Sequence, residues 1–157
     1  MSARLDALRF DLSATRDDLL ALIDALTPSD LSRPTHDGYR DVHDTLGHLA
    51  SAEAGRLLLT KTCLLIYPLS VPQFVINLVN AFNVGAKKRK SVEALKRDLE
   101  SGRRQVWRWL DRLREADLDR RVNDPLHGRR TLAEVIRLGH AGHERGHLEE
   151  ITRALAG

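Results

Sequence analysis

A chain of 157 residues can bury a substantial hydrophobic core, and we expect one domain over residues 1–157. Hydrophobic residues make up 42% of the chain and charged residues 30%, a balance that excludes a disordered protein. The net charge is only +3 and the arginines are scattered among the acids, which argues against nucleic-acid binding.

The sequence is typical of a cytoplasmic protein. Its first residues, MSARLDALRFDL, carry acids and lack the continuous apolar core of a signal peptide. No stretch reaches the roughly 18 uninterrupted apolar residues of a membrane span, so we expect no stable membrane insertion.

The single cysteine, Cys63, cannot form an intrachain disulfide, and its apolar neighbours predict a buried side chain. The densest basic cluster, residues 87–90, lies in a predicted connection and is a poor candidate for a binding site.

Two amphipathic helices open the chain. Six leucines and Thr15 recur at alternating spacings of three and four over residues 5–26, which predicts the first helix. After a connection over residues 32–40, Asp41 can cap a second helix that runs to about Lys61. His48 lies at the margin of the apolar side of this second helix.

Residues 62–86 form an extra apolar segment that two prolines interrupt. The sequence leaves two interpretations open. The segment is either a cover over the bundle or a homodimer surface, or it is the wall or lid of a hydrophobic ligand pocket. Contact with a membrane surface is a less favoured alternative.

A third helix is predicted from Ser91 to about Arg114, because its apolar residues keep a heptad repeat without a slip. Gly102 occupies one of the inward positions, where it either allows two helices to approach closely or leaves space for a site. Residues 115–130 are predicted to be the last connection, and no strand alternation is visible. These features predict an all-α four-helix bundle with the extra apolar segment between its second and third long helices.

The last helix should begin at Thr131, whose hydroxyl can cap the first turn while Glu134 reaches back. With 3.6 residues per turn, His143 and His147 stand one turn apart on its inward face, close enough to hold one ion. His140 lies one turn earlier on the same side. Buried imidazoles are costly unless they are hydrogen-bonded or bound to a metal.

The other histidines differ in how well they can reach this pair. His127 is separated from it by about 18 Å of helical rise, and His43 lies about 140° around the second helix from His48. His36 lies in a predicted loop, so His48 is the best partner. Three neutral imidazoles suit zinc or nickel and leave a position open for water or substrate. Because such spacings also occur by chance, hydrogen-bonded core histidines remain the alternative.

The stretches DTLGHLASAE and RTLAEVIRLGHAGHERGHLEEI, with LTPSDL after the first helix, resemble the DinB/YfiT-like superfamily over nearly the whole chain. Its members are four-helix bundles that bind a divalent metal through one His on the second helix and a His-xxx-His pair on the last. The resemblance implies metal ligands at His48, His143 and His147. It leaves His140 as a neighbour that either packs in the core or lies behind the ligands. It also implies that Glu150, where relatives often carry Gln, orients a ligand.

Characterised relatives include bacillithiol S-transferases and mycothiol-dependent maleylpyruvate isomerase. The resemblance therefore implies a metal-dependent enzyme of the transferase or isomerase type that activates a low-molecular-weight thiol, or a hydrolase that activates water. Its substrate would be a small hydrophobic or electrophilic molecule. The alternative is a non-catalytic bundle that binds a metal or a hydrophobic ligand. An open coordination position would favour the enzyme, whereas a fourth protein ligand such as Glu150 would favour a closed structural site.

Overall fold

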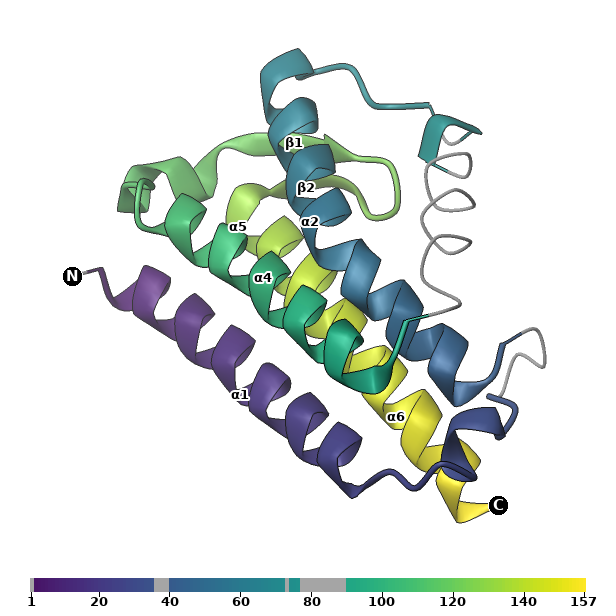
Figure 1. Cartoon of the computed structure of the whole chain (residues 1–157). Coiled ribbons are helices and arrows are strands. Elements are labelled where there is room, and N and C mark those ends of the chain that lie inside the picture. The colour runs from purple at the N-terminus through teal and green to yellow at the C-terminus, as the bar shows by residue number, and fades with distance from the viewer. Residues whose placement is uncertain (1, 36–39, 73, 77–89) are drawn as a thin grey trace.

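The computed structural model describes residues 2–35, 40–72, 74–76 and 90–157. Within these ranges, the chain forms a bundle of four long helices, and the predicted fold class is confirmed (Figure 1). These helices are α1 (Ala3–Ala25), α2 (Val42–Ile66), α4 (Val92–Leu110) and a C-terminal helix made of α5 (Leu132–Ile136), η3 (Arg137–Gly142) and α6 (His143–Ala156). Two short 3-10 turns, η1 (Asp30–Ser32) and η2 (Glu115–Asp119), lie in the connections. None of the helices in the described ranges is both long and apolar enough to cross a membrane.

Side-chain caps set the predicted helix starts. Asp41 and Ser91 each accept a backbone N–H from the first turn of their helix, and Thr131 forms a reciprocal capping box with Glu134. The predicted ends are less accurate. The second helix continues five residues beyond Lys61, to Ile66. The third stops at Leu110 instead of Arg114, because the chain tightens there into turns in which an N–H bonds three residues back.

A small antiparallel hairpin, β1 (Arg121–Asp124) and β2 (Gly128–Thr131), crosses one end of the bundle (Figure 1). The sequence predicted a plain connection here, and that prediction is wrong. Asp124 closes the turn, because its Oδ1 accepts two backbone N–H groups at 2.9 Å each. Gly128 has a φ of 72°, which a residue without a Cβ adopts at no steric cost. Strands of four residues are too short for a recognisable alternation.

A layer of buried charged side chains divides the hydrophobic core into two clusters, one nearer the hairpin and one nearer the opposite end. Each of the four long helices contributes one charged member, placed along the helix between its residues in the two clusters. These members are Arg16, Glu53, Arg103 and Glu144.

Each arginine of this layer bridges both glutamates. Arg16 donates to Glu53 at 2.9 Å and to Glu144 at 2.6 Å, and Arg103 donates to the same carboxylates at 3.0 and 2.5 Å. Burial raises the pKa of Glu53, but a hydrogen bond with His140 and the charges of Arg103 and Arg16 outweigh it and bring the pKa to about 2. The layer is therefore charged, internally neutral and shared by all four helices.

Gly102 of α4 lies directly against this layer. A Cβ at this position would stand 2.8 Å from the Cβ of Glu53 on α2, which is closer than real Cβ atoms approach. Of the two roles that the sequence left open, close approach of two helices is therefore the one that Gly102 performs.

Candidate metal centre

Three histidines from two helices meet beside the buried core. His48 comes from α2, and His143 and His147 come from the first two turns of α6. Their rings contact one another, with centroid separations of 5.2 Å for His48 and His143, 5.0 Å for His48 and His147, and 4.7 Å for His143 and His147. The structure thus brings together the three residues that the sequence selected.

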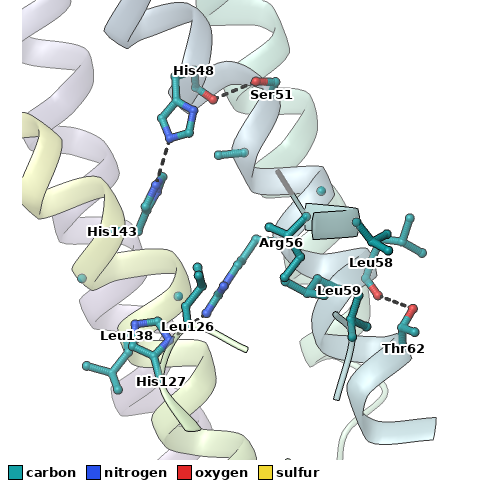
Figure 2. Close-up of a pocket in the computed structure, with 17 residues that line it drawn as sticks. His48, Ser51, Arg56, Leu58, Leu59, Thr62, Leu126, His127, Leu138 and His143 are labelled. Carbon is teal, nitrogen blue, oxygen red and sulfur yellow. Dashed lines mark hydrogen bonds between the residues drawn. The ribbon is translucent and has the colours of Figure 1, made fainter. Parts of the chain in front are cut away.

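The spacing of the three rings suits a single ion. Nε2 of His48 lies 3.2 Å from Nε2 of His143 (Figure 2). One ring nitrogen from each of the three histidines lies within 4.8 Å of the other two. Nitrogen ligands at about 2.0–2.1 Å from a tetrahedral zinc ion stand about 3.3 Å apart. The three histidines could therefore hold a metal ion after a small contraction.

Glu150 lies behind one of these rings. Its Oε2 is 2.7 Å from Nδ1 of His147, three residues away on the same helix. A carboxylate in this position makes Nδ1 the protonated nitrogen, so that Nε2 keeps a lone pair for an ion. The orienting role that the resemblance implied for Glu150 stays a prediction.

Burial keeps two of the three rings uncharged. Desolvation lowers the pKa of His48 to about 4, with smaller contributions from His147 and Arg40. Desolvation also lowers the pKa of His143 to about 3, together with the neighbouring His147 and His48. Both rings are neutral at pH 7, and neutral imidazole is the form that binds a divalent cation.

A π-helical segment, η3, leads directly into His143. In a π turn the hydrogen bonds reach five residues back, so the side chains on its two sides no longer follow the regular α-helical stripe. His140, inside this segment, points into the core, where its Nδ1 lies 3.2 Å from Glu53. Of the two roles that the resemblance left open for His140, packing or a position behind the ligands, its contact with Glu53 favours packing in the charged layer.

The remaining described histidines contact other groups. His43 bonds through Nε2 to the carbonyl of Lys90 at 2.8 Å, so it faces away from the three histidines as expected. His127, which was excluded as a ligand by distance, contacts Arg56 and Asp124 near the hairpin. His36 lies outside the described residues.

A pocket of about 570 Å³ lies next to the three histidines, a volume typical of small-molecule sites (Figure 2). His48 and His143 line it, as do Arg56 and His127. Most of its other lining is apolar and comes from α2 and from the segment that follows α2: Leu58, Leu59, Val71, Val75, Ile76, together with Leu126 and Leu138.

The extra apolar segment is thus part of the pocket wall wherever the structure describes it. Thr62, Val71, Val75 and Ile76 all line the cavity. This favours the pocket-wall interpretation over a simple cover for these residues. Residue 73 and residues 77–86 of the segment lie outside the described residues, as do residues 87–89 of the basic cluster.

Sequence reasoning missed Arg56, because it assigned most arginines to solvated helix faces. The signal was present: Glu53, Arg56 and Leu57 recur at helical spacing on the same buried side of α2. A charged residue on an apolar stripe indicates a buried partner or a ligand.

The fold and the site together define a class of protein: a small helical bundle with a candidate metal site between its second and last helices. The sequence itself identifies the family. A profile described as the DinB superfamily matches residues 11–151, and the chain belongs to that superfamily.

Solved structures share the fold at low sequence identity. An uncharacterized protein from Clostridium difficile 630 aligns with a TM-score of 0.76 at 11% identity, covering 99% of this chain and 98% of that one. YfiT from Bacillus subtilis, described as a probable metal-dependent hydrolase with an unusual four-helix bundle topology, aligns at 0.68 and 19%, covering 99% and 90%. The colibactin self-resistance protein ClbS, in complex with a dsDNA, aligns at 0.73 and 14%, covering 98% and 96%. No curated protein sequence matches the chain significantly.

Proposed function

We propose that His48, His143 and His147 hold a divalent metal ion, zinc or nickel, and that the protein is an enzyme acting on a small molecule in the adjoining pocket. The convergence of three ring nitrogens within 4.8 Å of one another, beside a largely apolar cavity, carries this proposal. When bound, the ion would supply a Lewis acid that lowers the pKa of a low-molecular-weight thiol or of water.

Glu150 favours a catalytic site over a closed structural one. Its carboxylate is engaged with Nδ1 of His147 at 2.7 Å. Glu150 then orients a ligand and is not itself a fourth ligand. Three protein ligands leave a coordination position for a substrate, and two of the three, His48 and His143, line the pocket.

Metal analysis of the purified protein and its variants tests the site. His48→Ala, His143→Ala and His147→Ala should each lower the metal content from about one ion per chain to a small fraction, because two imidazoles hold zinc poorly. His140→Ala is the matched control, since it removes a neighbouring histidine that contacts Glu53. Circular dichroism should show a helical fold in all four variants. An equal loss of metal in His140→Ala would contradict the assignment.

Activity assays separate the enzyme from the alternative. Zinc- or nickel-loaded protein should be assayed with bacillithiol, mycothiol or cysteine against a panel of electrophiles, and with ester and amide substrates. Turnover of a thiol supports a transferase or isomerase, and turnover without thiol supports a hydrolase. Tight metal binding without turnover of any substrate would favour a non-catalytic bundle that binds a metal or a hydrophobic ligand.

The proposed partners are a small molecule and a second copy of the chain, not a nucleic acid. Exposed apolar side chains follow one another near the end of α2 and beyond it, with Leu65 85%, Leu69 68% and Phe74 71% exposed, and these support a homodimer. A monomer at all concentrations in sedimentation would exclude the dimer.

The expectation that the protein does not bind nucleic acid needs its own test, because ClbS is in complex with a dsDNA. A mobility-shift assay with duplex DNA provides it, and salt-sensitive binding would contradict the expectation.

A further inference from the structure

Arg56 is a buried cation on the wall of the pocket, and two of its three side-chain nitrogens have no acceptor among the described residues. Its side chain is only 9% exposed. Nη2 donates to Asp124 at 3.0 Å and lies 2.9 Å from Nδ1 of His127, toward which Figure 2 shows it extending. Nε and Nη1 are also buried, and neither has a hydrogen-bond partner among the described residues. Buried N–H groups of a charged side chain are rarely left in this state.

The fold makes room for the guanidinium at this place. A Cβ on Gly139 of η3 would stand 2.9 Å from Nη2 and 3.0 Å from Cζ of Arg56, and closer still to Nε. Only a residue without a side chain therefore fits beside Arg56 here. On the other side, Asp124 is fully buried and holds Nη2. The arginine is fixed from two directions while Nε and Nη1 stay unused.

The two hydroxyl groups of the pocket wall already donate to backbone carbonyls. The hydroxyl of Ser51 donates to the carbonyl of Gly47 at 3.1 Å, and that of Thr62 donates to the carbonyl of Leu58 at 3.0 Å. A ligand that enters this cavity therefore meets apolar side chains, the histidines and Arg56. Among these lining residues, Arg56 is the one that carries a permanent positive charge.

We propose that Arg56 anchors a carboxylate of the substrate, so that the pocket takes a small amphipathic carboxylic acid. The apolar body of the ligand would lie against α2 and the described residues of the 71–76 segment, and its carboxylate would accept hydrogen bonds from Arg56. Guanidinium donors match carboxylate oxygens in geometry and charge. This inference rests on the proposed function, since it names the substrate class of the pocket beside the three histidines.

Binding of matched eight-carbon probes tests the anchor. Calorimetry with octanoate, octanol and octylamine on the full chain, both metal-free and zinc-loaded, compares three head groups on the same apolar tail. The metal-free protein should bind octanoate about tenfold or more tightly than octanol, as expected for charge-assisted hydrogen bonds. Octylamine should bind more weakly than octanol, because its cation would lie next to Arg56.

Arg56→Gln should abolish the preference for octanoate over octanol. Arg104→Gln is the control, because it removes an arginine of α4 that is 61% exposed. Arg56→Gln leaves the Asp124 carboxylate buried without its cation, which can unfold the protein. The double variant Arg56→Gln/Asp124→Asn removes both charges and should show the same loss of preference, with circular dichroism confirming the fold.

Three results would overturn the anchor. These are equal affinities for octanoate and octanol, a preference that survives in both Arg56 variants, and a preference that requires zinc, which would place the carboxylate on the ion. The metal site fails separately, since zinc binding is measured without any probe. Loss of zinc binding with an intact octanoate preference would contradict the metal centre and leave the anchor standing.

Discussion

Glu150 restrains the ring of His147, one of the three histidines proposed to hold the metal ion. Its Oε2 lies 2.7 Å from Nδ1 of His147, and both residues stand on α6. This contact holds the ring in one orientation and favours the tautomer that is protonated at Nδ1. Partners of this kind contribute strongly to metal affinity, because an unrestrained imidazole must first be ordered.

Glu150→Ala should weaken zinc binding by about 10- to 100-fold, because the ring of His147 loses its hydrogen-bond partner. Glu150→Gln should weaken it less, since the amide oxygen can still accept from Nδ1–H. Competition with a chelator of known affinity measures both. Glu149→Ala, which changes an exposed neighbour, should leave the affinity unchanged. Equal affinities for the Ala variant and the wild type would contradict the role of Glu150.

Acid should destabilise the metal-free protein through His48 and His143. Their pKa values in the folded protein, about 4 and about 3, lie below the ordinary 6.5, so the unfolded chain takes up protons first as the pH falls. The stability associated with the neutral rings is therefore present above pH 6.5 and is lost as the pH falls toward these values. Urea unfolding at a series of pH values should show this decline. The double variant His48→Asn/His143→Asn should show a shallower one, and an unchanged slope would contradict the assignment.

Glycines at helix contacts decide how closely the helices of the bundle approach. Gly102 lies against Glu53 of the neighbouring helix, whereas a Cβ on Gly146, in α6, would meet no atom within 4 Å. Both positions are helical, so the cost of glycine in a helix is similar. They differ only in the space around them.

Gly102→Ala and Gly146→Ala should change the free energy of unfolding in opposite directions. Gly102→Ala should destabilise by about 1–3 kcal/mol, because its Cβ would overlap Glu53 and force α2 and α4 apart. Gly146→Ala should stabilise by about 0.5–1 kcal/mol, because alanine loses less backbone entropy and meets no clash. Thermal and urea unfolding measure both. Stabilisation by Gly102→Ala would show that the contact relaxes freely.

At the scale of the whole molecule, the buried charged layer joins the four long helices to one another. Arg16 and Arg103 each contact both Glu53 and Glu144, so removing any one member leaves a buried charge that the others no longer balance. Such a layer specifies how the helices are aligned along one another, because sliding one helix would separate the charges.

Glu144→Ala should destabilise the protein by about 3–5 kcal/mol, since two buried arginines lose a carboxylate. Urea unfolding at neutral pH measures the change. Asp119→Ala is the control, because it breaks an ion pair with Arg4 that is exposed on both sides, and it should change the stability little. Similar effects from both substitutions would contradict the structural importance of the layer.

Local patterns in the chain were sufficient to predict the four long helices, their caps at Asp41 and Thr131, and the choice of His48, His143 and His147. Helical periodicity and capping depend on residues within a few positions of one another, so they can be read without the fold. Folding alone revealed the hairpin, the π turn, the orientation of His140 and the burial of Arg56. The hairpin strands are too short to show an alternation in the sequence. The orientation of His140 and the burial of Arg56 depend on contacts between segments far apart in the sequence, because the other elements decide whether a charged or polar side chain finds a partner.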